Sequence, residues 1–304
     1  MSKNKVIIIG GTGFVGFHLA KFLLKKNFEV VSLSRKGPKK IRFLKKVKYI
    51  KTDIIYKKKL LKCLHKHLNS NFVINCGGEV EHRKIKKTIL SHHKGAINIA
   101  NIFLNKNLKK FIQIGSSLEY GSLKSPQKEF FNCKPESNYS KAKYLATKNL
   151  FSLYRKHNLP LVVIRPYQLY GPAQDTNRFI PFIIKACLQD KNFPCSDGKQ
   201  YRDFLYIDDF VNFIFKIIEK DNIKGEIFNI GFGNPKKIKD VIFKITKIIK
   251  KGTAEFGKIK LRAEENLITY PNIVKATKLT KWRPKVTIKS GLQKTVRYYR
   301  NLYL

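Results

Sequence analysis

The stretch that decides the fold is Val-Ile-Ile-Ile-Gly-Gly-Thr-Gly-Phe-Val-Gly, residues 6–16 of a 304-residue chain. The apolar run at residues 6–10 predicts a buried strand, and residues 14–26 have the pattern of a helix, so the glycines lie in the turn between them. Such glycines allow a tight turn and a close approach of the backbone to a pyrophosphate at the helix N-terminus. The turn therefore predicts a dinucleotide site formed by Gly10, Gly13, Phe14, Val15 and Gly16.

Short apolar runs and helical patterns continue to alternate after this turn. Further strands are expected at residues 29–34, 47–51, 72–76, 111–115 and 161–165, and helices at 89–104 and 139–156. This alternation predicts an α/β fold with a Rossmann-type doubly wound parallel sheet that binds ligands at its carboxyl edge.

The pattern loosens after Arg165, where Pro166, Pro172, Pro181 and Pro194 are expected to punctuate loops. Only residues 208–220 and 238–250 look helical there. We therefore expect a dinucleotide-binding domain over residues 1–165. Residues 166–304 should form a smaller substrate-binding region that is interleaved with the first.

The chain is strongly basic. Lysine and arginine number 63 against 20 acidic residues, which gives a formal net charge of +43. Such a balance normally suggests nucleic acid or an anionic membrane as a partner. However, 52 of the basic residues are lysines spread along the chain and only 11 are arginines, the residue preferred for base and phosphate recognition. We therefore do not expect nucleic acid as a partner, although a positive field should attract phosphorylated ligands.

The five cysteines are widely spaced and include no Cys-x-x-Cys pair. This pattern is typical of reduced thiols in the cytoplasm and not of disulfides or a zinc site. We therefore expect a cytoplasmic protein without a bound metal. No apolar stretch reaches the roughly 20 residues that span a bilayer, so no membrane span is expected.

Residues after the second, third and fourth strands bear on the choice of cofactor. An acidic residue after the second strand would bind the 2′-hydroxyl of NAD(H), whereas an arginine would accommodate the 2′-phosphate of NADP(H). The chain has Ser34-Arg35-Lys36 at this place, which favours NADP(H). The alternative is that Arg35 is an ordinary surface charge, so NAD(H) stays open. Further cofactor contacts are expected from Asp53, Ile54, Cys76, Gly77 and Gly78.

Tyr139 and Lys143 lie four residues apart on an expected helix and therefore share one face. The ordinary pKa of tyrosine is about 10, so a nearby ammonium is needed to favour its phenolate at neutral pH. Tyr139 could then exchange a proton with a carbonyl or carbinol oxygen as a hydride moves. Because this spacing arises by chance in a lysine-rich chain, it gains weight only from Ser116, whose hydroxyl follows the fifth strand at the same sheet edge.

Five segments, in this order, resemble those of the NAD-dependent epimerase/dehydratase family, the extended short-chain dehydrogenases/reductases. They are Gly10/Gly13/Gly16, Ser116 through Gly121, Tyr139/Lys143, Arg165-Pro166 with Tyr170-Gly171-Pro172, and Arg202-Asp203-Phe204 with Asp208-Asp209. The resemblance implies an enzyme that acts on a nucleotide-activated sugar, with Ser116, Tyr139 and Lys143 as catalytic residues. It also implies a homodimer, which is common among similar proteins.

The resemblance also implies further contacts. Pro166, Tyr167 and Leu169 would flank the nicotinamide. Candidate substrate residues are Ser117, Gln168, Asn177, Arg202 and Arg262, of which the two arginines would bind the diphosphate. The alternative for Arg262, next to Glu264 and Glu265, is an ordinary surface charge. One departure from the family pattern is His92, which stands where similar proteins often have asparagine.

Several reactions are compatible with the resemblance. Similar dehydratases have an Asp-Glu pair directly after the catalytic hydroxyl, and similar fucose-forming epimerase-reductases have a cysteine two residues after it. Here Ser117-Leu118 follows Ser116, which disfavours both reactions. A 4-keto-sugar reductase using NADPH is favoured by Arg35, and a 4-epimerase with tightly bound NAD is the alternative. A non-catalytic NADPH- or RNA-binding relative is a distant alternative. Such a protein would not need Ser116, Tyr139 and Lys143, and this chain has all three.

Overall fold

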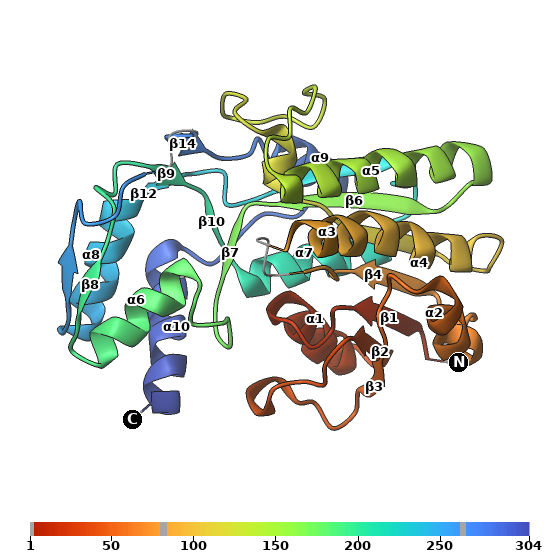
Figure 1. The fold of residues 1–304 in the computed structure, drawn as a ribbon, viewed down its shortest axis with the longest axis horizontal. Coiled ribbons are helices and arrows are strands. Elements are labelled where there is room, and N and C mark those ends of the chain that lie inside the picture. The colour runs from red at the N-terminus through yellow and green to blue at the C-terminus, as the bar shows by residue number, and fades with distance from the viewer. Residues whose placement is uncertain (1–2, 80–83, 262–265, 304) are drawn as a thin grey trace. The chain divides into compact units, whose positions relative to one another are not determined.

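The computed structural model describes residues 3–79, 84–261 and 266–303 (Figure 1). Its largest element is a seven-stranded sheet with the strand order β11-β6-β5-β4-β1-β2-β3. The strands are β1 (Lys5–Ile9), β2 (Glu29–Ser34), β3 (Lys48–Lys51), β4 (Phe72–Asn75), β5 (Lys110–Ile114), β6 (Leu161–Pro166) and β11 (Glu226–Ile230).

Neighbouring strands from β3 to β6 run parallel, so their carboxyl ends meet at one edge. Ile7 of β1, for example, lies beside Val31 on one side and Val73 on the other. Central strands of this kind are buried on both faces and are therefore continuously apolar. The order of the strands confirms the expected doubly wound α/β fold, and the six expected strands lie within a residue of their predicted positions.

Helices cover both faces of this sheet. Apolar side chains of α2, α4 and α5 form one core with the strands, while α1 and α7 contact each other through Phe22 and Phe215. The helices are α1 (Phe14–Lys25), α2 (Lys57–Leu64), α3 (Ile85–Ile89), α4 (Gly95–Phe103), α5 (Asn138–His157) and α7 (Ile207–Glu219).

The chain divides by its internal contacts into two units. The first, which contains the large sheet, comprises Met1–Gly121, Phe131–Pro166 and Val211–Phe228, and the second comprises Ser122–Phe130, Tyr167–Phe210 and Asn229–Leu304. The second unit holds short strands in three small sheets: β7 (Gln168–Tyr170) with β10 (Phe204–Tyr206), β12 (Lys236–Lys237) with β9 (Tyr201–Arg202) and β14 (Ile268–Thr269), and β13 (Thr253–Glu255) with β8 (Asn192–Pro194). Its helices are α6 (Phe179–Leu188), α8 (Ile238–Ile249), α9 (Val274–Thr280) and α10 (Ile288–Tyr303).

Several local predictions were wrong. Helices α6, α9 and α10 of the second unit were not expected, and Pro166 and Pro194 end β6 and β8 instead of lying in loops. The expected helix over residues 89–104 is interrupted, because a π-helical turn at Leu90–Lys94 separates α3 from α4. Pro181 does not lie in a loop but in the first turn of α6, where a proline removes no intrahelical hydrogen bond.

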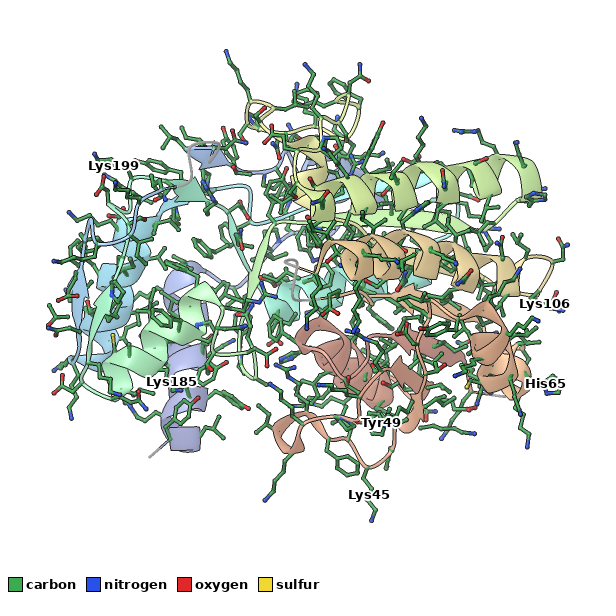
Figure 2. The ribbon with its side chains drawn as sticks, viewed as in Figure 1. Lys45, Tyr49, His65, Lys106, Lys185 and Lys199 are labelled. Carbon is green, nitrogen blue, oxygen red and sulfur yellow. The ribbon has the colours of Figure 1, made fainter. Side chains whose placement is uncertain are left out.

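Lysine side chains extend outward from the surface, as Lys45, Lys106 and Lys199 do from the segments between the helices and strands (Figure 2). Within the described residues, no helix is long and apolar enough to cross a membrane.

Candidate active site

The glycine turn joins the end of β1 to the start of α1. Gly13 is the N-cap of α1, and no side chain caps this helix end, so its first N–H groups point to where an anion would bind. A Cβ atom at Gly16 would lie 2.4 Å from the carbonyl oxygen of Gly10 and 2.5 Å from the Cα of Gly11. The turn therefore has the backbone exposure and tight packing that a dinucleotide pyrophosphate requires.

Arg35 follows β2 and already has an acidic partner. Its Nη1 atom lies 3.0 Å from Oε2 of Glu79, a buried carboxylate in the segment after β4, and Nζ of Lys87 lies 3.8 Å from the same oxygen. Ser34, the last residue of β2, donates its hydroxyl to the Leu33 carbonyl. The end of β2 therefore offers no carboxylate that would repel a 2′-phosphate. Such a phosphate would, however, compete with the Glu79 carboxylate for the Arg35 guanidinium.

The segments after β3 and β4 are held by side-chain hydrogen bonds. Asp53 accepts a bond from the Ile55 N–H at 3.1 Å, and the Asn98 amide donates to the carbonyls of Ile54 and Ile55. After β4, burial raises the pKa of the Cys76 thiol to about 12, against the opposing charge of Lys143. Cys76 is therefore neutral at physiological pH.

The two glycines after Cys76 have different roles. A Cβ atom at Gly77 would lie 2.7 Å from the Ile9 side chain. Gly78 has a φ of +145°, a conformation that side chains rarely adopt. Both positions thus leave no room for a side chain at the carboxyl end of the sheet, and their contact with a cofactor stays a prediction.

Tyr139 and Lys143 lie in the first turns of α5. The Ser137 hydroxyl caps this helix by accepting a bond from the Ser140 N–H at 3.1 Å. The buried Lys143 donates to the carbonyl of Ile114, the last residue of β5, at 2.7 Å. Its Nζ atom also lies 5.9 Å from the centre of the Tyr139 ring. Lys143 therefore is bonded to the strand end that precedes Ser116 and places its positive charge near the Tyr139 ring.

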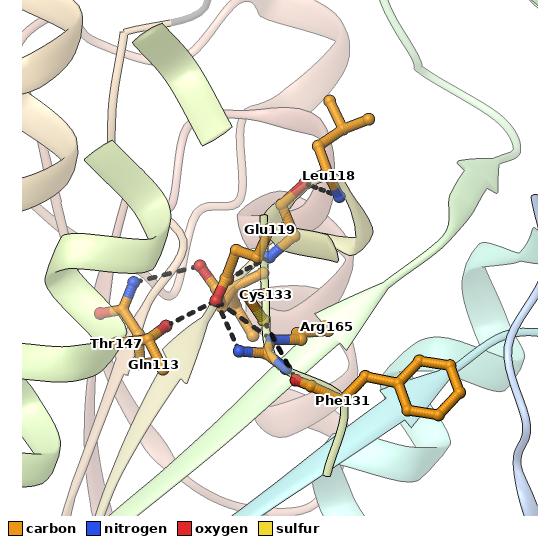
Figure 3. A network of polar contacts seen from close by, with 9 residues as sticks. Gln113, Leu118, Glu119, Phe131, Cys133, Thr147 and Arg165 are labelled. Atoms are coloured by element: carbon orange, nitrogen blue, oxygen red, sulfur yellow. Dashed lines mark hydrogen bonds and ion pairs between the residues drawn. The ribbon is translucent and has the colours of Figure 1, made fainter. Parts of the chain in front are cut away.

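Ser116 is buried and caps the 3₁₀ turn Ser117–Tyr120, with its Oγ accepting from the Leu118 N–H at 3.2 Å. Glu119 reaches back to the Ser116 N–H at 2.9 Å. Its other oxygen accepts from Thr147 at 3.0 Å and from Arg165 at 3.1 and 2.9 Å (Figure 3). A buried ion pair therefore fixes the backbone that carries Ser116.

Cys133 lies beside this ion pair (Figure 3). Burial raises the pKa of its thiol, while the Arg165 charge opposes that shift, so the thiol stays protonated at neutral pH. Among the described residues, no group of three or more His, Cys, Asp or Glu side chains could hold a metal ion.

The second unit contains a cavity of about 390 Å³. Gln168 and Arg202 line it together with Phe179 and Phe204, whose rings are stacked with centroids 5.9 Å apart. Arg202 also donates to the carbonyls of Tyr201 and Leu267 at 2.9 and 3.3 Å. Asn177 is not one of the residues that line this cavity, and Arg262 lies outside the described residues.

Other motif residues of the second unit have structural contacts. Tyr167 is buried and donates its hydroxyl to Gln127 at 2.6 Å, and Leu169 pairs with Leu205 between β7 and β10. Asp203 accepts bonds from three successive N–H groups, those of Phe232, Gly233 and Asn234.

A family model described as the NAD dependent epimerase/dehydratase family matches residues 6–231. The chain belongs to this family. The match covers both the glycine turn and the Tyr139–Lys143 helix, and it confirms the resemblance seen in the sequence.

Relatives in this family span almost the whole chain. A CDP-abequose synthase of Salmonella typhimurium is 28% identical and covers 97% of this chain and 98% of its own length. A UDP-N-acetyl-alpha-D-glucosaminuronate decarboxylase of Bacillus cytotoxicus is 26% identical, with 99% of each chain covered. The crystal structure of a UDP-glucuronic acid 4-epimerase from Bacillus cereus, in complex with UDP-glucuronic acid and NAD, has a TM-score of 0.88. It is 28% identical and covers 98% of this chain and 100% of its own.

Reasoning from the sequence missed Glu119 in this family member. A signal was present, because Ser116-x-x-Glu119 has the spacing of a capping box, and the structure contains both of its bonds. It also missed the pairing of Arg35 with Glu79, which no sequence pattern indicates, because the two residues follow different strands.

Proposed function

We propose that this chain is an NAD(P)-dependent oxidoreductase acting at C4 of a nucleotide-activated sugar, and specifically a 4-keto-sugar reductase. The observation that carries the proposal is the grouping of Ser116, Tyr139 and Lys143 around the end of β5, in the unit that also holds the glycine turn. The three relatives described above carry the names of enzymes that make or modify nucleotide-activated sugars.

The proposed chemistry assigns a role to each side chain. A bound reduced dinucleotide would supply a hydride to the C4 carbonyl carbon. Tyr139 would donate its phenol proton to the carbonyl oxygen, and the Ser116 hydroxyl would donate a hydrogen bond to the same oxygen. Lys143, held by the Ile114 carbonyl, would stabilise the phenolate left on Tyr139 through its positive charge.

The cavity of the second unit supports a nucleotide as part of the substrate. Its stacked Phe179 and Phe204 rings suit a planar base, and the Arg202 guanidinium suits a diphosphate. Ser117, Gln168, Asn177 and Arg262 remain proposed substrate contacts. A positive net charge would further attract such a ligand.

Reduction is preferred over epimerisation because Arg35, and not an acidic residue, follows the end of β2 at Ser34, which supports exchangeable NADPH. A 4-epimerase with bound NAD is the second candidate. It is favoured by the Arg35–Glu79 pair, which occupies the guanidinium, and by the NAD in the related UDP-glucuronic acid 4-epimerase structure.

The test is to denature the purified protein and identify any dinucleotide that it releases. An empty site that binds NADPH more tightly than NADH supports the reductase, and bound NAD that does not exchange supports the epimerase. Arg35→Asp should then abolish the preference for NADPH. Lys36→Asp, an equal change of charge at an exposed neighbour, should leave the preference unchanged.

A further inference from the structure

His92 is a buried histidine in the π-helical turn between α3 and α4, with only 6% of its surface exposed. Short π-helical turns inside α-helices are rare and occur frequently at functional sites. This turn makes contacts with α5, the helix that carries Tyr139. The insertion therefore places the side chain at position 92 where an uninterrupted helix would not.

The imidazole ring is fixed on one side by the segment after β4. Its Nε2 atom lies 3.0 Å from the Glu79 carbonyl oxygen. Since a carbonyl only accepts, this bond requires a proton on Nε2. The Glu79 N–H in turn donates to the Ser91 hydroxyl at 2.9 Å, so residues 91 and 92 both bind the backbone of Glu79.

Gly78 makes room for the ring. A Cβ atom at Gly78 would lie 1.9 Å from Cε1 and 2.1 Å from Nδ1 of His92, distances that no side chain could occupy. The glycine and the imidazole therefore fit each other, and the ring has little freedom to turn.

The same ring contacts the proposed proton donor. The ring centroids of His92 and Tyr139 are 4.9 Å apart, and their planes meet at 87°, the edge-to-face geometry that aromatic pairs prefer. Lys143, on the same helix, is already held by the Ile114 carbonyl. The phenol thus packs against a ring whose own position is set by Gly78 and Glu79.

We propose that His92 is a positioning residue for Tyr139: its imidazole, held by the Glu79 carbonyl, sets the orientation of the phenol. The catalytic part of this inference rests on the proposed function of Tyr139. A planar ring with a donor on its far edge meets both requirements, contact with the phenol and a bond to Glu79, whereas an amide can donate the bond but has no ring to pack against the phenol.

The experiment compares His92→Gln with His92→Phe. Glutamine can keep a donor for the Glu79 carbonyl but has no ring, whereas phenylalanine keeps the ring and loses the donor. We expect His92→Gln to lower kcat for reduction of a 4-keto nucleotide sugar by about 100-fold, as small displacements of reacting groups do, with KM and dinucleotide affinity unchanged. His92→Phe should lose clearly less of kcat than His92→Gln, because its ring can still pack against Tyr139 although the bond to Glu79 is lost. His93→Gln is the matched control. It makes the same substitution at the neighbouring histidine, whose ring is bonded to Asn149.

A second measurement does not depend on turnover. A fluorotyrosine at position 139 should give one sharp fluorine NMR signal in the unaltered protein and in His92→Phe, and a broadened or split signal in His92→Gln. His92→Asn replaces His92→Gln if the latter does not fold. An unchanged spectrum, or equal losses of kcat and dinucleotide affinity in both variants, would overturn the proposal. If no sugar is reduced even by the unaltered protein, the proposed function fails, and the spectra still decide the role of His92.

Discussion

The Glu119 carboxylate is fully buried, yet both of its oxygens accept hydrogen bonds. It accepts bonds from Ser116, Thr147 and twice from Arg165. Burial by itself would lower the pKa of Arg165, but Glu119, with Tyr120 and Cys133, raises it above its ordinary value. Arg165 therefore stays charged, and removal of the Glu119 carboxylate would leave its buried guanidinium uncompensated.

Glu119→Gln should destabilise the fold by about 3–5 kcal/mol, the cost of breaking a buried ion pair on one side. Urea unfolding followed by circular dichroism measures the change. Glu219→Gln is the matched control, since Glu219 forms an exposed pair with Lys216 at 3.6 Å and should cost no more than about 1 kcal/mol. Equal effects of the two substitutions would contradict the role assigned to Glu119.

The positions of single residues were predictable from the sequence where local spacing determines them, while their catalytic roles stay predictions. Tyr139 and Lys143 share a helix face, and Ser116 follows a strand, so local patterns were enough to group them. Arg35 shows the limit, because its carboxylate partner Glu79 follows another strand 44 residues away. Such a contact depends on the order of the strands, which the local pattern does not specify.

Among the elements, the turn from β1 to α1 makes a strict demand on side-chain size. A Cβ atom at Gly16 would lie within 2.5 Å of backbone atoms of Gly10 and Gly11, and backbone cannot swing aside as a flexible side chain would. The turn must therefore open if this glycine is replaced.

Gly16→Ala should weaken dinucleotide affinity by at least about tenfold, because a loss of only 1.4 kcal/mol produces that change. Calorimetric titration with NADPH and NADH measures it. Gly37→Ala serves as the comparison, since a Cβ atom there has nothing within 4 Å. The account of this turn is wrong if Gly16→Ala binds as tightly as Gly37→Ala does.

The elements themselves were predictable to the extent that they are periodic. Buried strands such as β2 and the long helix α5 have strong apolar patterns and lie within a residue of their expected bounds. The interruption of the expected helix over residues 89–104 was not predictable, because the π-helical turn at Leu90–Lys94 has no distinctive composition. The pattern does not predict α6, because Pro181 is more typical of a loop, and it does not predict α10, because the C-terminal residues are weakly apolar.

At the scale of the whole molecule, the net charge of +43 is the dominant feature. Exposed lysines far outnumber the acidic groups that could neutralise them, so the folded chain repels itself. Salt at about 0.1 M screens charges beyond roughly 10 Å. The doubly wound topology was nevertheless predictable, because it follows from the β-α-β alternation and not from surface charge.

Added salt should therefore stabilise the protein. Raising NaCl from low concentration to about 0.15 M should increase Tm by at least about 2 °C, the shift that 1 kcal/mol produces in a large domain. Differential scanning fluorimetry measures the change, and KCl should act like NaCl because the effect is screening. A constant or falling Tm would show that self-repulsion is negligible.

The central claim, that this chain transfers a hydride to C4 of a nucleotide-activated sugar, is tested most directly with a deuterated cofactor. The protein is incubated with deuterium-labelled NADPH or NADH and 4-keto sugars carrying UDP, CDP, GDP or dTDP, and the products are analysed by mass spectrometry and NMR. We predict deuterium at C4 of one product, and a rate about 10²- to 10⁴-fold lower in Tyr139→Phe. No transfer to any of these sugars, or a rate that does not depend on Tyr139, would contradict the claim.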